Sequence, residues 1–490
     1  MGILSLLLWT PAFGVLLLAL TPAHYVPILR VISGGTAALT LLLAICVMVR
    51  YDAFNSALQF SELFILNSDL GNTYALGVDG LSLPMVLLTG LLTGTALLLS
   101  TGITEHIKTY HICILLLEFG LLGVFLAQDW VLFYFFWEAT LIPLFFLIDR
   151  WGSKRRHGAS LNFLLYNLGG SIFILVSLFA LGEYMPEQGG SLMGALGEAA
   201  QTMPENEQVL VLIGFLIGFG VKMALFPLHG WLPLVHVAAP MPVDIVLSGI
   251  LLKMGAYGLL RAVVMLPVAV EALQSILVFL ALFTMLYGGL LAWRQSDLKA
   301  MLAYASISHM GVILLGMVTL NLTGLTGAVL QMTAHGLIFG ALFLFVGLLA
   351  ERTGTSNIQD YSSLSLVMPR FAILTTLTLL AAMGLPGSVG FIAELHTLIG
   401  GFERWGGWMV FFSLSILVGA VYTIRTIGAL FMGPTKPNML ALVDIQNHEL
   451  VIASALVSII MLLGFFPTVL IDLSVATLAQ INRIMTERVL

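Results

Sequence analysis

Charged residues are scarce in this chain. Of its 490 residues only 9% are charged and 59% are hydrophobic, whereas a soluble globular domain carries about 25% charged residues. The scarcity excludes a soluble protein. The apolar residues are gathered in runs of about 20, the length of a helix that crosses a hydrocarbon core, and not in the alternating stretches of about 10 residues that build a membrane barrel. The sequence therefore predicts an all-α integral membrane protein.

Cysteine and several motifs are also missing. Cys46 and Cys113 stand on separate predicted spans, which leaves no CxxC pair and no disulfide framework. There is no GxxxxGKS/T loop, no complete GxGxxG and no HExxH, so this chain is not expected to bind NAD, flavin, an iron–sulfur cluster or ATP. A net charge of -6 without a basic patch argues against a nucleic-acid partner. Energy must then come from an ion gradient or from a redox machine in another subunit.

About fourteen apolar spans follow one another along the chain, with no stretch left over for a soluble domain. They cover approximately 3–21, 26–49, 81–100, 112–128, 130–149, 161–182, 209–229, 241–265, 271–292, 299–318, 322–350, 370–398, 407–432 and 450–470. The first basic residue is Arg30, so the first run is predicted to be a span and not a cleaved signal peptide. The longest loops are 50–80 and 183–208. The second loop has no Lys or Arg and holds Glu183, Glu187, Glu198, Glu205 and Glu207.

The basic residues indicate which side each loop faces. Ten lie in or beside the loops after odd-numbered spans: Lys108, Arg150, Lys154, Arg155, Arg156, Arg294, Lys299, Arg352, Arg370 and Lys436. Four lie in the even loops and the termini: Arg50, Arg404, Arg483 and Arg488. By the positive-inside bias the odd loops face the cytoplasm. Both termini are then predicted on the opposite side, the periplasm or a lumen.

A few charged residues remain inside the predicted spans. Arg30 and Arg261 lie near span ends, where a long side chain can reach the interface. Lys222 and Lys253 lie mid-span, and each would cost about 2.5 to 3.5 kcal/mol if unpaired. With the acids Glu138 and Glu394, these two lysines are the main candidate functional residues.

Other polar residues in apolar surroundings are secondary candidates. Glu118 is a further buried-acid candidate, and Asp244 is either a buried acid or a cap on the start of a helix. His335 and His309 lie in QMTAHGLIFG and SISHMG. A single membrane histidine is more often a packing residue, but imidazole also suits a proton relay because its unperturbed pKa is about 6.5. His229, His236 and Arg425 are also secondary candidates, with Arg425 either a packing partner or a path residue.

Two spans contain helix-breaking residues. The seventh continues into KMALFPLHGWLPLVHVAAPMP, and the twelfth contains MGLPGSVGFIAE. Interrupted helices at corresponding places in two halves indicate an inverted-repeat transporter, with its ion path at the repeat interface. We therefore expect a three-helix segment at 1–110, five-helix repeats at 111–265 and 266–435, and a C-terminal helix with its tail at 436–490.

The buried charges suggest a mechanism. A buried carboxylate and a buried ammonium each stabilise the other's charged form when they are close, so Glu138 and Lys222 are predicted to form an ion pair. Drawing Lys222 away from Glu138 would remove its counter-ion and let the lysine pass a proton on. The expected order along the membrane midplane is Glu138, Lys222, Lys253, the histidine region and then Glu394.

These stretches closely resemble the antiporter-like subunits of complex I and its relatives. The resemblance runs from about residue 76 to 400 and rests on LGVDGLSLPMVLLTG, FYFFWEATLIPLFFLI, KMALFPLHGWLP, LSGILLKMGAYGLLR, DLKAMLAYASISHMG, QMTAHGL and GLPGSVGFIAE. A glutamate at 394 is similar to the NuoM or NdhD branch, whereas the NuoL and NuoN branches and many Mrp antiporter subunits tend to carry lysine there. The resemblance implies fourteen helices, broken seventh and twelfth helices, and proton translocation through Glu138, Lys222, Lys253, His335 and Glu394.

The same resemblance implies partners and a location. Quinone, iron–sulfur clusters and the electron donor would be bound by other subunits, and the neighbours would be NuoL- or NdhF-type and NuoN- or NdhB-type subunits, surrounded by lipid. The APMPV and LLKMGAYGLLR segments look closest to the cyanobacterial and chloroplast group, which favours a thylakoid membrane over a bacterial inner membrane. An Mrp-type cation/proton antiporter subunit, or a stand-alone secondary transporter, predicts the same buried charges and is the alternative. A purely structural scaffold gives no reason to keep two mid-span lysines.

One segment departs from the family's pattern. Relatives usually read WLPDAH, whereas this chain reads WLPLVH, with Leu234 and Val235 in place of Asp and Ala. Asp244 stands where relatives often carry Ser or His. An acid is thus lost at one position and gained about ten residues later, so the resemblance does not determine the contacts around His236.

Overall fold

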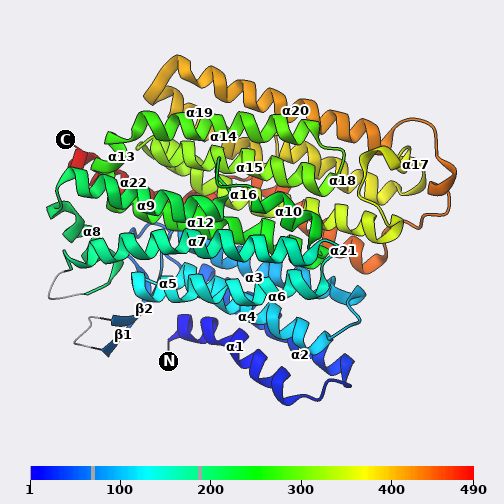
Figure 1. The fold of residues 1–490 in the computed structure, drawn as a ribbon, viewed down its shortest axis with the longest axis horizontal. Helices are drawn as coiled ribbons and strands as arrows, with labels where there is room; N and C mark the ends of the chain where they lie inside the picture. Colours follow the sequence, from blue (N-terminus) through cyan, green and yellow to red (C-terminus); the bar gives the residue numbers. More distant parts are fainter. Residues whose placement is uncertain (1, 68–71, 186–189, 490) are drawn as a thin grey trace. The chain divides into compact units, whose positions relative to one another are not determined.

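The computed structural model describes residues 2–67, 72–185 and 190–489, and helices account for most of it (Figure 1). Glu187 of the acidic loop lies outside the described residues. Thirteen helices in the described ranges are long and apolar enough to cross a membrane, and two shorter apolar helices, Ser82–Leu98 and Pro369–Ala382, accompany them. The predicted all-α membrane architecture is confirmed, whereas the inverted repeats stay a prediction.

The chain divides into two compact units. Unit 1 comprises Met1–Met223, Ile250–Leu277 and Asp472–Leu490, and unit 2 comprises Ala224–Gly249 and Val278–Ile471. The elements of unit 1 are α1 (Ile3–Leu20), α2 (Val26–Arg50), β1 (Gln59–Asn67), β2 (Asn72–Val78), α3 (Ser82–Leu98), α4 (Ile107–Leu126), α5 (Trp130–Ala139), α6 (Leu141–Trp151), α7 (Arg156–Gly182), α8 (Met193–Ala199), α9 (Glu205–Met223), α12 (Leu252–Met265) and α13 (Pro267–Ala272).

Unit 2 contains the remaining helices. They are α10 (Trp231–Ala238), α11 (Met241–Val246), α15 (Leu298–Val318), α16 (Leu322–Thr353), α17 (Leu364–Val367), α18 (Pro369–Ala382), α19 (Val389–Trp405), α20 (Val410–Phe431) and α21 (Asn447–Phe465). Two of the four unit boundaries fall within α14 (Gln274–Arg294) and α22 (Thr468–Val489). The helix α22 adds a candidate span beyond the last predicted one, in a segment expected to be a tail.

Short polar side chains fix where several helices begin. Asp129 accepts hydrogen bonds from the backbone N–H groups of Val131 and Leu132 at 2.9 and 3.0 Å, and Asp297 accepts one from Ala300 at 2.9 Å at the start of α15. These carboxylates satisfy N–H groups that have no partner within the helix itself. Helix α16 ends at Thr353, and the next residue, Gly354, has a φ of 74°, the left-handed conformation that glycine adopts without strain.

An antiparallel hairpin of β1 and β2 lies in the predicted loop 50–80, where only a loop was expected. Its Glu62 carboxylate accepts hydrogen bonds from the N–H groups of Leu4 and Ser5 at 2.9 and 3.1 Å, so the hairpin caps α1. Thr73 of β2 donates a hydrogen bond to Asp129 Oδ2 at 2.8 Å, and Ser191 donates another to the same oxygen at 2.5 Å. Asp129 therefore joins the hairpin and the acidic loop 183–208, through Ser191, to the start of α5.

Both predicted helix interruptions are present. Helix α9 ends at Met223 and α10 begins at Trp231, with a cis peptide bond before Pro227 in the intervening turn. Helix α18 ends at Ala382 and α19 begins at Val389, and between them Gly384 and Gly387 have φ values of 78° and 95°. The prolines and glycines that signalled the breaks therefore stand at or beside them.

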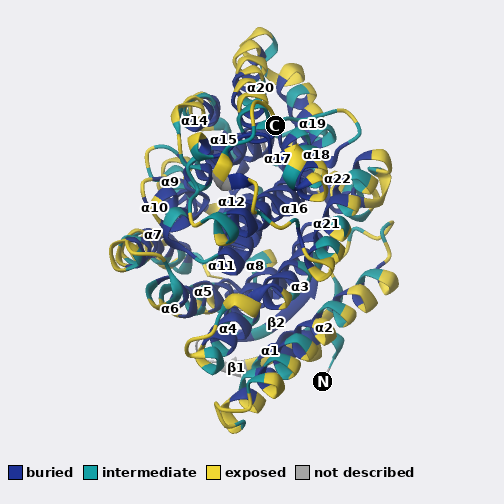
Figure 2. Cartoon of the chain, turned by 90° about the vertical axis from the view of Figure 1, so that its right-hand side faces the viewer, coloured by how far each residue is buried: buried dark blue, intermediate teal, exposed yellow. Residues whose placement is uncertain are grey.

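Helix α16 forms the interior of unit 2. Every residue from Gly324 to Leu349 is buried, and Figure 2 shows this helix in the colour of buried residues, whereas α2, α7 and α20 carry many exposed residues. A helix that is apolar and buried all round needs neighbours on every side. Polar groups on α16 are consequently kept away from lipid.

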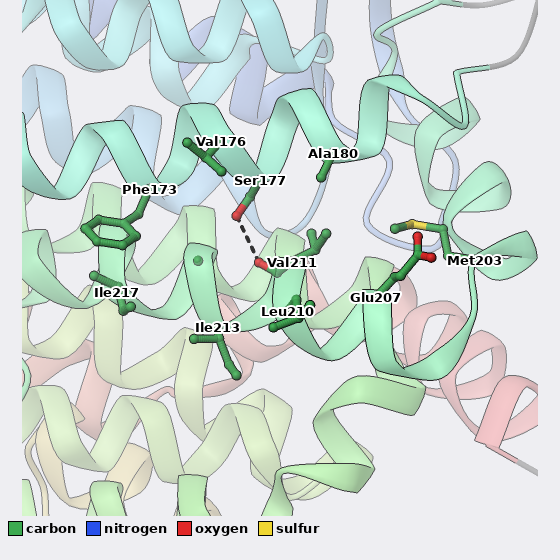
Figure 3. Close-up of a pocket in the computed structure, with 11 residues that line it drawn as sticks. Phe173, Val176, Ser177, Ala180, Met203, Glu207, Leu210, Val211, Ile213 and Ile217 are labelled. Atoms are coloured by element: carbon green, nitrogen blue, oxygen red, sulfur yellow. Dashed lines mark hydrogen bonds between the residues drawn. The ribbon is translucent and has the colours of Figure 1, made fainter.

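A groove runs along α7 and α9 in unit 1. Its lining is largely apolar, with Phe173 and Ile217 toward one end and Glu207 and Met203 toward the other, and Ser177 donates a hydrogen bond to the Val211 carbonyl at 3.0 Å across it (Figure 3). Glu207 is the one acid in this lining, and it accepts a hydrogen bond from Tyr184 at 2.7 Å. The groove therefore contains none of the candidate functional residues.

Candidate functional site

Lys222 is buried in unit 1, in the last turn of α9, and its side chain is 1% exposed. Its ammonium nitrogen lies 5.1 Å from the ring centroid of Trp137 and 5.6 Å from that of Phe163. Within the described residues it has no hydrogen-bond partner. The negative faces of the two rings stabilise the cation, but they provide no acceptor that would hold its proton.

Glu138 lies near the end of α5, next to Trp137, and is half-buried. One of its oxygens is buried without a hydrogen-bond partner in the described part of the chain. Among the described residues the ammonium lies on aromatic faces and forms no hydrogen bond with the carboxylate, but Glu138 interacts with Lys222 through its charge, so the predicted ion pair stays a prediction. Sequence reasoning could not place Trp137 and Phe163 there, since they come from α5 and α7.

The second lysine, Lys253, is completely buried in α12. Helix α12 packs against α9 at Gly255, where an added Cβ would lie 2.8 Å from the Phe219 carbonyl oxygen and 2.9 Å from the Met223 backbone nitrogen. Only glycine permits this approach. The approach brings the start of α12, with Lys253, to the end of α9, with Lys222.

Two further ionisable sites of unit 1 differ in their partners. Glu118 in α4 is fully buried, and neither of its oxygens has a hydrogen-bond partner among the described residues. Arg261, by contrast, forms an ion pair with Asp79 at 2.7 Å and donates a hydrogen bond to the Tyr257 hydroxyl at 2.9 Å. That Arg261 reaches the interface stays a prediction, and the structure adds its ion pair with Asp79. Asp79 lies in the quoted LGVDGLSLP segment, but it was not singled out.

In unit 2 Glu394 lies beside two histidines. Its Oε1 is 3.5 Å from Nδ1 of His309, and the ring centroids of His309 and His335 are 5.6 Å apart. Gln331 of α16 forms a hydrogen bond of 2.9 Å with the same His309 nitrogen. The structure therefore brings together three of the predicted candidates, and it adds Gln331, which sequence reasoning missed although it stands in the quoted QMTAHGL.

The Glu394 side chain lies against the interruption between α18 and α19. A Cβ added at Gly384 would lie 2.7 Å from Oε2 of Glu394, so the carboxylate packs against the break in the chain. A cavity of about 20 Å³ adjoins His309, Glu394 and Tyr422, and a space of that size holds about one water molecule. A carboxyl, an imidazole and a water in contact can exchange protons.

A second polar group of unit 2 contains His236 and Asp244. Asp244 Oδ1 is 2.9 Å from His236 Nδ1, and Oδ2 is 2.7 Å from the Lys299 ammonium, which also donates to the Ala239 carbonyl at 2.7 Å. The side chains of His236 and Asp244 are fully buried. Asp244 is therefore a buried acid and not a helix cap. Lys299, which the sequence assigned to a cytoplasmic loop, turns its ammonium inward.

The two remaining secondary candidates have other surroundings. His229 lies in the turn between α9 and α10, with the rings of Phe226, Tyr287 and Tyr304 around it. Arg425 is exposed and donates a hydrogen bond to the Trp293 carbonyl. This contact is that of a packing partner.

The sequence is similar to a known family of membrane proteins and to named relatives. A family described as NADH:quinone oxidoreductase/Mrp antiporter, TM, matches residues 127–419, a range that includes Glu138 and Glu394. NAD(P)H-quinone oxidoreductase chain 4 2 of Thermosynechococcus vestitus is 37% identical over 475 residues, covering 92% of this chain and 88% of that protein.

Solved structures show the same fold. A chain of respiratory complex I from Thermus thermophilus, solved with bound NADH, has a TM-score of 0.90 and 29% identity, covering 98% of this chain and 99% of that one. A chain of the Mrp complex from a Dietzia species has a TM-score of 0.85 at 20% identity over the whole of both chains, a likeness of fold alone. From the matched range and the extent of identity, the chain belongs to the NADH:quinone oxidoreductase/Mrp antiporter membrane family.

Proposed function

We propose that this chain is the proton-translocating chain 4 subunit, of the NuoM or NdhD branch, in a complex that passes electrons from NAD(P)H or ferredoxin to a quinone. The observation that carries the proposal is Lys222, an ammonium buried in the candidate span Glu205–Met223 over two aromatic rings and without a hydrogen-bond acceptor among the described residues. Burying such an ammonium in a membrane span costs free energy, and a role as a proton carrier explains why the chain keeps this one. The similarity to the chain 4 protein of Thermosynechococcus vestitus and to a chain of Thermus thermophilus complex I supports the assignment.

The proposed path uses the groups that the two units bury. Protons pass along the midplane through Glu138, Lys222 and Lys253 in unit 1 and through His335 and Glu394 in unit 2. Because Glu138 interacts with Lys222 through its charge, a movement of Glu138 toward the lysine or away from it changes how firmly the lysine holds its proton. The energy for that movement comes from electron transfer elsewhere in the complex.

The partners follow from this assignment. Electron donor, iron–sulfur clusters and quinone, as plastoquinone in a thylakoid, are bound by other subunits, and the chain itself holds no redox centre. Its neighbours are NuoL- or NdhF-type and NuoN- or NdhB-type membrane subunits, with lipid on the exposed apolar side chains. The likeness to a cyanobacterial relative supports a thylakoid membrane over a bacterial inner membrane.

The test is proton pumping by the assembled complex. In sealed membrane vesicles supplied in parallel with NADH, NADPH or reduced ferredoxin, Lys222→Ala and Glu138→Gln should each lower the protons moved per donor oxidised by at least tenfold. Lys154→Ala is the matched control, because Lys154 is exposed, and it should pump as the wild type does. Wild-type pumping by both Lys222→Ala and Glu138→Gln would contradict the proposal.

A Mrp-type antiporter subunit is the alternative, since the same buried charges and the same fold serve it. The assemblies differ in composition. The chain 4 assignment expects iron–sulfur clusters and quinone reductase activity in the purified native assembly. Sodium/proton exchange by an assembly without iron–sulfur clusters would favour the alternative.

A further inference from the structure

Asp244 connects two basic side chains of unit 2, His236 and Lys299. One carboxylate oxygen is 2.9 Å from His236 Nδ1, and the other is 2.7 Å from the Lys299 ammonium. Both oxygens are thus used, each by a different partner. Because the carboxylate also faces an ammonium, it is ionised, and Nδ1 of His236 carries the hydrogen that it donates to Oδ1.

The charges of this cluster allow it to gain one proton. With a neutral imidazole, the ammonium and the carboxylate of the His236–Asp244–Lys299 cluster sum to zero. A proton that binds the second ring nitrogen, Nε2, makes the imidazolium, and the sum becomes +1. Without the Asp244 charge the same two states would be +1 and +2. Buried charge is costly at low dielectric, so the carboxylate makes the protonated state accessible.

Neighbouring charges do not duplicate this role. At the end of α16, Arg352 is paired with Glu449, and Glu351 interacts with Lys299 through its charge. Asp244 is the acid that contacts both Lys299 and His236 in the described structure. Leu234, where relatives usually carry the acid, is 50% exposed. The acid at 244 is therefore in different surroundings from one at 234.

Two phenylalanines separate the cluster from Glu394. His236 stacks on Phe343 with ring centroids 4.2 Å apart, and His335 stacks on Phe339 at 4.1 Å. Residues 335, 339 and 343 recur every four positions and so share one face of α16. Along that face the rings of Phe339 and Phe343 lie between the two histidines. The Asp244 cluster, with His236, and the Glu394 cluster, with His309 and His335, are consequently two sites.

We propose that His236, Asp244 and Lys299 form a proton-storage site of unit 2, additional to the Glu394 site, in which Asp244 positions and balances His236. The inference rests on the proposed proton-translocating function. In each cycle one N–H bond forms at Nε2 of His236 as an O–H bond of a hydronium ion breaks and leaves water, and the same N–H bond breaks when the proton moves on to a water molecule, which becomes hydronium. The carboxylate and the ammonium keep their protonation states throughout.

The experiment compares three variants of the complete complex in sealed vesicles, with pumping expressed per donor oxidised and assembly checked on native gels. Asp244→Asn should assemble and lose at least threefold in protons per donor, while donor oxidation falls less. Asp244→Glu, which restores the charge, should retain more than half of wild-type pumping. Asp297→Asn is the control, because that residue caps α15 through an acceptor that asparagine also provides, and it should pump as the wild type does.

The outcomes separate this inference from the proposed function. If the wild type moves no protons, the proposed function fails. If the wild type pumps and Asp244→Asn pumps equally, the storage site alone is overturned, and so it is if Asp244→Glu is as impaired as Asp244→Asn. Should Asp244→Asn fail to assemble, His236→Gln decides, because glutamine can donate to Oδ1 but takes up no proton: loss of pumping supports the site, and wild-type pumping overturns it.

Discussion

At the scale of single residues, the ammonium of Lys222 depends on ring faces. Trp137→Leu removes the nearer ring, and with it a cation–π interaction worth about 0.5 to 2 kcal/mol. We expect protons pumped per donor oxidised to fall several-fold in Trp137→Leu and to fall less in Trp137→Phe, which keeps a ring. The measurement is vesicle acidification alongside donor oxidation.

Trp130→Leu is the matched control for this prediction. Trp130 is also a buried tryptophan of α5, but it stacks on Phe215, with ring centroids 5.6 Å apart. The control should lower the thermal stability of the complex and leave its proton-to-donor ratio unchanged. Equal ratios in Trp137→Leu and Trp130→Leu would show that the ring faces do not support the lysine.

Individual functional residues were predictable where charge is rare, and their partners were not. Lys222, Lys253 and Glu394 stand out because each is an ionisable group within an apolar run. The partner of Asp244 could not be read in the same way, since Lys299 lies 55 residues away in the chain and follows a polar segment that looks like a loop. Contacts of that kind depend on tertiary packing, which the periodicity of one helix does not contain.

At the scale of elements, the contact of α16 with α19 sets where Glu394 lies. A Cβ added at Gly327 would come within 2.5 Å of the Thr397 backbone nitrogen, one helical turn from Glu394. Gly327→Ala should therefore shift α19, destabilise the complex by about 1 to 3 kcal/mol, and lower proton pumping. The measurements are thermal unfolding of the solubilised complex and vesicle acidification.

Gly428→Ala controls for the glycine substitution itself. Gly428 lies in α20, where an added Cβ meets no atom within 4 Å, so this variant should be as stable as the wild type or slightly more stable. A Gly327→Ala complex with unchanged stability and pumping would mean that α19 can move without consequence.

Element prediction succeeded for apolar runs and breaks and failed for the hairpin and α22. The hairpin strand β1 carries Phe64 and Ile65 as successive apolar residues, so it lacks the alternation that identifies a half-buried strand. Helix α22 contains Asp472, Arg483, Glu487 and Arg488, and the mean hydropathy of its apolar stretch is 1.2, the lowest among the candidate spans. Both elements are held by tertiary contacts more than by a local signal.

At the scale of the whole molecule, each compact unit buries its own set of ionisable groups. Unit 1 contains Lys222, Lys253 and Glu118, and unit 2 contains Glu394 and Asp244. The family range of 127–419 includes four of these five residues. The predicted repeat boundaries at 111–265 and 266–435 stay a prediction, because repeats have to be recognised by superposing one on the other.

The orientation of the chain is a prediction at the same scale. The bias of ten basic residues against four places both termini on the periplasmic or lumenal side. Alkaline phosphatase fused after the last residue should be active, and green fluorescent protein fused there should be dark. Fusions after Gln295, in a loop predicted to be cytoplasmic, should give the reverse. The opposite pattern at both positions would invert the predicted orientation.

The four hydrogen bonds of Asp129 offer a way to sort acids by task. Its two oxygens accept from Val131, Leu132, Thr73 and Ser191, and a carboxylate has about four acceptor positions. A proton could bind there only by displacing a donor. Both oxygens of Glu118 lack a hydrogen-bond donor in the described chain, so either of them can bind a proton without displacing one. Counting donors on each carboxylate therefore separates acids that fasten segments together from acids with room for a proton, before any activity is measured.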